Sequence, residues 1–164
     1  MTRLSAILLF VFLSACAGFQ PMHGTAETQT AFSDMVVEVG DGGDEGDRMA
    51  GFLIRQRLAD RMSRNDAPTY KLTIAPSSQR VGIGLTGQDF ATRFDGVVTA
   101  EWSLVRLADG AQVASGRARS VATYSADQDP YRLQSTSDQA TQRAARDVAD
   151  QLLQQVALEL ADAS

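Results

Sequence analysis

The side chains best suited to covalent or metal chemistry are few in this sequence. Its 164 residues include one cysteine, Cys16, and one histidine, His23. A catalytic triad or a zinc site would have to recruit His23, but this residue lies in a Gly-, Thr- and Gln-rich segment without periodicity. We therefore expect no catalytic or metal-binding role for it. A lone cysteine cannot close an internal disulfide, so Cys16 requires another explanation.

The residues that precede Cys16 have the order of an export signal. Arg3 supplies a positive charge, residues 6–13 are apolar, and Ser14 and Ala15 are small, as in secretory signal peptides. The 8-residue apolar run is far shorter than the roughly 20 residues that span a bilayer. The run from Leu13 to Cys16, Leu-Ser-Ala-Cys, resembles the bacterial lipobox. This resemblance implies cleavage before Cys16 and acylation of the cysteine; the alternative is an ordinary export signal with a chance cysteine.

Lipidation would hold the protein firmly at a membrane. One acyl chain binds only marginally, at roughly 0.8 kcal/mol per buried methylene, but a bacterial lipoprotein carries three. Ala17 follows the cysteine, and lipoproteins retained in the inner membrane have Asp there, so the resemblance implies an outer-membrane protein on the periplasmic side. We expect a signal peptide over residues 1–15, a lipidated N-terminus and tether over residues 16–33, and a single α/β sandwich domain over residues 34–164.

One glycine-rich segment matches a nucleotide-binding motif without its context. Residues 82–87 read G-x-G-x-x-G, but a dinucleotide site needs this run to open a helix after a strand. Here residues 88–94 lead into another strand. In a dinucleotide site an acidic residue about 20 positions after the glycines binds the ribose, but the residue at that sequence spacing, Asp109, falls in a predicted turn. We interpret residues 82–87 as a flexible loop.

An acidic segment is likewise a poor metal site. A calcium loop counted from Asp41 would place Gly43 and Phe52 at ligand positions 3 and 12. We interpret the segment as a solvated loop in which Asp47 caps the following helix. Because no pair of acids stands out for glycosidase chemistry either, we expect neither an enzyme nor any cofactor other than covalent lipid on Cys16.

The spacing of apolar residues predicts the elements that would position these side chains. Alternation predicts strands and a four-residue period predicts helices. We expect a strand over residues 35–39, a helix over about 48–64, a strand over 70–74, a loop or irregular hairpin tip over 76–88, a long strand over about 93–107 and a returning strand over 112–124. The helix would place Gly51, Ile54, Leu58 and Met62 on one face.

The last helix has the clearest pattern. Apolar residues recur every four positions, at Ala140, Ala144, Val148, Leu152, Val156 and Leu160. A second, adjacent row is Ala145, Ala149, Leu153 and Ala157, so we expect an amphipathic helix of about 25 residues with an Ala-rich face. The order β-α-β-β-β-α predicts an α+β fold, with a four-stranded mixed sheet and two helices packed on one face.

The central hairpin has a predicted register. A three-residue loop over residues 108–110, with Gly110 left-handed, would pair Leu107 with Ala111 and Trp102 with Gly116. The indole would then cover a residue without a side chain. The same register places Leu104 opposite Ala114, Ala100 opposite Ala118, and Glu101 opposite Arg117.

Charge excludes one broad class of function. The formal net charge is −5, and removal of the signal would leave 149 residues with 14 basic and 20 acidic side chains. An acidic domain argues against general nucleic-acid binding, which needs a basic face. All basic residues but Lys71 are arginine, which suits carboxylate and phosphate contacts but is equally explained by a GC-rich genome.

The segment after the lipobox resembles a known family. Residues 16–24, Cys-Ala-Gly-Phe-Gln-Pro-Met-His-Gly, resemble the mature N-terminus of the lipopolysaccharide-assembly lipoprotein family LptE, which begins Cys-Gly-Phe-x-Pro-Leu-Tyr/His-Gly. The chain differs by the inserted Ala17 and by Met22 in place of Leu. The element order, the segments Tyr124-Ser125 and Pro130-Tyr131, and the Ala-rich last helix are also similar to that family.

The resemblance implies a function and partners. LptE proteins plug the lumen of the outer-membrane β-barrel LptD, assist its assembly and contact the lipopolysaccharide that the pair delivers to the cell surface. Arginine is the natural contact for phosphate groups, and the candidates are Arg80, Arg93, Arg117 and Arg119. Each is alternatively a surface arginine or a cross-strand ion-pair partner. The alternative function is that of another envelope lipoprotein, an accessory or binding subunit of a lipid-transport or cell-wall machine.

Overall fold

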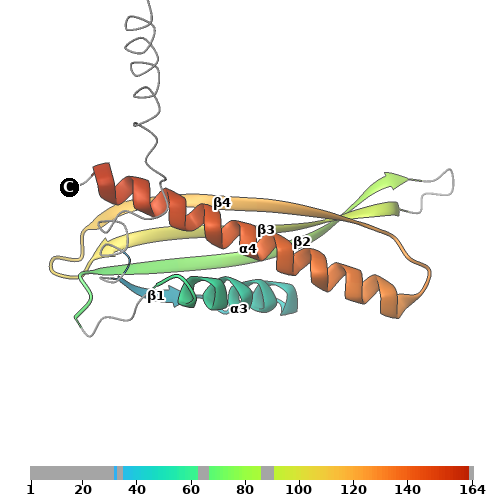
Figure 1. The fold of residues 1–164 in the computed structure, drawn as a ribbon, viewed down its shortest axis with the longest axis horizontal. Helices are drawn as coiled ribbons and strands as arrows, with labels where there is room; N and C mark the ends of the chain where they lie inside the picture. The colour runs from blue at the N-terminus through green and yellow to red at the C-terminus, as the bar shows by residue number, and fades with distance from the viewer. Residues whose placement is uncertain (1–31, 33–34, 63–66, 86–90, 163–164) are drawn as a thin grey trace, which may run out of the picture.

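The computed structural model describes residues 32, 35–62, 67–85 and 91–162, and it has the predicted α+β fold. The elements are β1 (Met35–Val39), α3 (Glu45–Ala59), β2 (Tyr70–Leu85), β3 (Ala91–Arg106), β4 (Gln112–Ser125) and α4 (Pro130–Asp162). The sheet order is β1-β2-β3-β4, with β1 parallel to β2 and the other pairs antiparallel. Figure 1 shows α3 beside β1 and β2, and α4 running along the sheet.

One face of the sheet and both helices form a single core. Strand side chains alternate between the two faces of a sheet, and the buried strand residues that pack against the helices alternate along the middle of β2, β3 and β4. The fully buried large side chains are Ile54 and Leu58 from α3, Leu72, Ile74, Val98 and Leu104 from the sheet, and Val148, Leu152 and Val156 from α4. Both helices therefore lie on the same face, as the sequence predicted.

Helix α3 begins earlier than expected and is capped by another residue. Asp44 is the N-cap: its backbone is extended and its side chain accepts a 2.8 Å hydrogen bond from the Asp47 amide. The prediction that Asp47 is the cap is wrong. Asp47 lies in the first turn, and its carboxylate accepts bonds from the amides of Gly43 (2.9 Å) and Ser78 (2.6 Å). It thereby ties the start of α3 to β2, and α3 ends at Ala59 rather than near residue 64.

Strand β2 is much longer than expected. The predicted loop over residues 76–88 is wrong as far as Leu85, because β2 continues to that residue, paired with β3. Pro76 and the glycines suggested a loop, but Pro76 is buried opposite Ala100. The interpretation of residues 82–87 as a flexible loop fails for residues 82–85 for the same reason. Long-range pairing with β3 therefore outweighs the local preference of this segment.

The hairpin register is confirmed where it positions the core. Trp102 pairs with Gly116 and Glu101 with Arg117, and the predicted alanine pairings are also present. The turn itself differs: Val105 pairs with Gln112, so Val113 is an extra residue on β4 and forms a β-bulge. The Arg106 amide bonds to the Ala111 carbonyl at 2.8 Å, so the loop spans four residues and the predicted pairing of residue 107 with residue 111 is wrong. Gly110 is left-handed, with φ of 71°.

Helix α4 has 33 residues rather than about 25. It begins at Pro130, which suits a first helical position because its missing N–H would have no intrahelical partner. Asp129 accepts a 2.9 Å bond from the Tyr131 amide at this end. At 1.5 Å per residue the helix is about 50 Å long, so it extends past the start of α3. The two helices are joined by Arg57, whose Nε and Nη2 donate to the Asp150 carboxylate at 3.1 and 2.9 Å.

Candidate functional site

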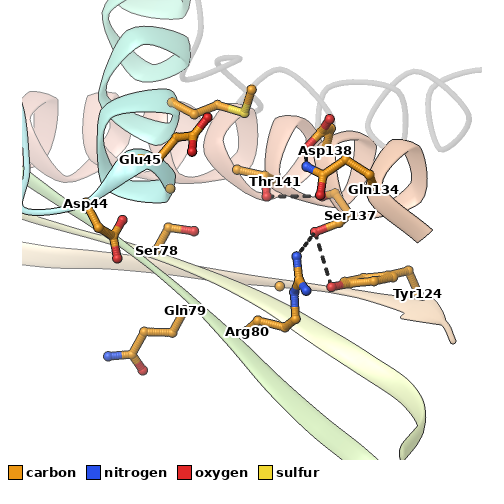
Figure 2. A pocket seen from close by; sticks show the side chains of 13 residues that line it. Asp44, Glu45, Ser78, Gln79, Arg80, Tyr124, Gln134, Ser137, Asp138 and Thr141 are labelled. Carbon is orange, nitrogen blue, oxygen red and sulfur yellow. Dashed lines mark hydrogen bonds between the residues drawn. The ribbon is translucent and has the colours of Figure 1, made fainter. Parts of the chain in front are cut away.

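A groove opens where α4 extends past the N-terminal end of α3. Its volume is about 620 Å³, within the range of natural ligand pockets. One wall is the start of α3, the other is α4, and the floor belongs to the three long strands (Figure 2). The lining residues are Asp44, Glu45, Gly46, Met49, Ser78, Gln79, Arg80, Gly96, Tyr124, Gln134, Ser137, Asp138 and Thr141.

A hydrogen-bonded cluster forms one end of the groove. Arg80 Nη2 donates to Ser137 Oγ at 3.1 Å, and the Tyr124 hydroxyl lies 3.2 Å from the same oxygen (Figure 2). The Arg80 guanidinium also lies 5.9 Å from the ring centroid of Phe94, within reach of a cation–π interaction. Phe94 in turn stacks on Tyr124, with 5.6 Å between ring centroids. Because Ser137 is only 9% exposed, these partners satisfy a hydroxyl that would otherwise be buried unpaired.

The charges around the groove do not favour an anionic ligand. Asp44, Glu45 and Asp138 line it against the single cation Arg80, so an anion near Arg80 would meet three carboxylates. The side-chain partners of Ser137 are an arginine and a tyrosine, not the histidine that most often activates a serine nucleophile. Within the described ranges, no three histidine, cysteine or acidic side chains are grouped to hold a metal ion.

The opposite side of the sheet is uncovered. We define the open face as the strand side chains that point away from the helices. They are Val36 and Glu38 on β1; Lys71, Thr73, Ala75, Ser77, Gln79, Val81 and Ile83 on β2; Arg93, Asp95, Val97, Thr99, Glu101, Ser103 and Val105 on β3; and Ser115, Arg117, Arg119, Val121, Thr123 and Ser125 on β4. Most of them are polar or charged, which is the alternation expected of a sheet with one buried face.

The four arginines predicted from sequence do not form one site. Arg80 lies under the helices, in the groove, whereas Arg93, Arg117 and Arg119 belong to the open face. Arg117 forms the predicted ion pair with Glu101. The lipopolysaccharide contacts expected of these residues stay predictions. Cys16, His23 and the predicted signal lie outside the described residues, as does the predicted tether except for Phe32.

Sequence reasoning missed the cluster around Ser137. Its members come from three strands and a helix, and Phe94 and Tyr124 were not singled out as site residues. In the structure Phe94 pairs with Tyr124 across β3 and β4, and Arg80 pairs with Gly96 across β2 and β3. The second pairing could be inferred from the sequence only if β2 were predicted at its full length. Because residues 76–88 are predicted as a loop, the sequence alone does not place Arg80 on a strand.

Within the described part of the chain, no helix is long and apolar enough to cross a membrane. Comparison with family models gives no match, and no curated protein sequence matches the chain.

Solved structures, in contrast, share the fold. A candidate lipoprotein of Caulobacter crescentus is similar with a TM-score of 0.65 and 25% identity, over 85% of this chain and 98% of its own. The rare lipoprotein B of Shewanella oneidensis has a TM-score of 0.60 at 16% identity, covering 78% of this chain and 96% of its own. An uncharacterized lipoprotein B of Nitrosomonas europaea has a TM-score of 0.59 at 14% identity, covering 85% and 90%. The chain is therefore similar in fold, over nearly the full length of each, to bacterial proteins described as lipoproteins.

Proposed function

We propose that this chain is an outer-membrane lipoprotein, anchored through Cys16, that occupies the lumen of an LptD-type barrel, helps that barrel to assemble and takes part in lipopolysaccharide transport. The observation that carries the proposal is the stretch from Cys16 to Gly24, which resembles the LptE N-terminus apart from the inserted Ala17 and from Met22 in place of Leu. The fold supports it, because the structures that share it are described as lipoproteins.

The surface of the domain suits such a setting. The interior of a large outer-membrane barrel is polar, and the open face offers threonine, serine and charged side chains rather than a broad apolar patch. A single core of buried apolar residues packs the helix layer against the sheet. A plug needs this combination of a rigid interior and a polar exterior.

The proposal also assigns the protein to binding rather than catalysis, with the lipid on Cys16 as its only attached group. It is supported by the chemistry of the groove, in which Ser137 bonds to an arginine and a tyrosine rather than to the histidine usual beside a serine nucleophile. The three carboxylates of the groove face one arginine whose guanidinium already bonds to Ser137. Such a cluster stabilises the contact between α4 and the sheet.

Depletion of the protein in its own cells tests the proposed function. The amount of correctly assembled LptD-type barrel should fall, and sensitivity to large hydrophobic antibiotics should rise, because the permeability barrier depends on surface lipopolysaccharide. Re-expression of the intact chain is the control and should restore both. Normal barrel levels with a normal barrier would contradict the proposal and favour an accessory subunit of another envelope machine.

A further inference from the structure

We draw no further inference here: the strongest candidate, the groove of about 620 Å³ between the start of α3 and α4, belongs to the site already described, and it carries nothing more because its carboxylates are an acidic cluster without any unpartnered buried polar side chain, among the described residues, that would point to a ligand.

Discussion

The single residue Trp102 connects three elements of the fold. Its ring covers Gly116 on the neighbouring strand, and its Nε1 donates to Gln155 Oε1 on α4 at 2.8 Å. Gln155 then donates through Nε2 to the Arg117 carbonyl at 3.2 Å. A side chain that is 4% exposed thus has its one polar group satisfied, and it links β3, β4 and α4.

Gly116→Ala should destabilise the domain. A Cβ at this position would lie 2.7 Å from Trp102 Cζ2 and 2.9 Å from Cε2, and the buried indole has no free direction in which to move. We expect a loss of about 1–3 kcal/mol in the free energy of unfolding, as for other overpacked sites. Urea denaturation measures it. Ser115→Ala, at the exposed neighbouring residue, is the control and should stay within about 0.5 kcal/mol of the parent; an equal effect of both changes would contradict the argument.

Asp47 should make stability depend on pH in the acid range. Burial acts to raise the pKa of this carboxyl, but bonds from the backbone at Gly43, Ser78 and Asp44 outweigh it, so its pKa lies below the ordinary value of 3.8. A depressed folded-state pKa stabilises the fold fully above the unfolded value, and this contribution is lost as pH falls through the folded one. The free energy of unfolding should therefore fall below about pH 4, and less so in Asp47→Asn. An Asp47→Asn variant with the same acid dependence as the parent, or the same change caused by Asp41→Asn, would refute this role.

At the scale of elements, α4 approaches the sheet closely because its inner face is built from small residues. Ala144, Ala145 and Ala149 are 0% exposed, and they bring the helix backbone near β3 and β4. Ala145→Leu would force a larger side chain into this contact and should cost about 1–3 kcal/mol of unfolding free energy. Arg146→Leu, an exposed neighbour, should change it by less than about 0.5 kcal/mol. Thermal melting of the two variants compares them, and an unaffected Ala145→Leu variant would show that α4 is packed loosely.

Periodic elements and the hairpin core could be predicted from sequence for a physical reason. A buried face repeats every second residue in β3 and β4 and about every fourth residue in α4, so local pattern determines which side chains face inward. The register followed from matching Trp102 to Gly116 and Glu101 to Arg117. The bulge at Val113 could not be predicted from sequence. A three-residue loop without a bulge and a four-residue loop with a one-residue bulge give the same pairing over the rest of the hairpin.

The candidate site was harder to predict than the fold. The second half of β2 contains a proline and glycines at positions that locally favour a loop, and only pairing with β3 makes it a strand. The contact between Arg80 and Ser137 spans 57 residues of sequence and leaves no local pattern. The cap of α3 was missed for a similar reason: Asp47 suits a cap, but the amide of Ser78 recruits its carboxylate instead.

At the scale of the whole molecule, the domain has two distinct sides. The helices and the groove lie on one side of the sheet, whereas the open face on the other side carries no helix of the described ranges. Figure 1 shows α4 running along the long strands and α3 beside β1 and β2. A lipid anchor at the N-terminus would hold this two-sided domain at the membrane, in reach of a partner embedded there.

Cys16→Ala should abolish the anchor. If the lipobox directs processing, the variant has no thiol to acylate, so it should take up no labelled palmitate and should leave the membrane fraction. Ser14→Ala is the matched control, since alanine is also a lipobox residue at that position, and it should label normally. Palmitate label of normal intensity on Cys16→Ala would show that the cysteine is not the lipidation site.

The central claim is that this lipoprotein works inside a barrel, and co-purification from its native membrane tests it most directly. The intact, affinity-tagged lipoprotein is extracted in mild detergent, and its partners are separated by size and identified by mass spectrometry. We predict one LptD-type barrel in equimolar amount, retained through gel filtration and lost only on denaturation. Recovery of the lipoprotein alone, or with a non-barrel envelope complex in its place, would contradict the assignment.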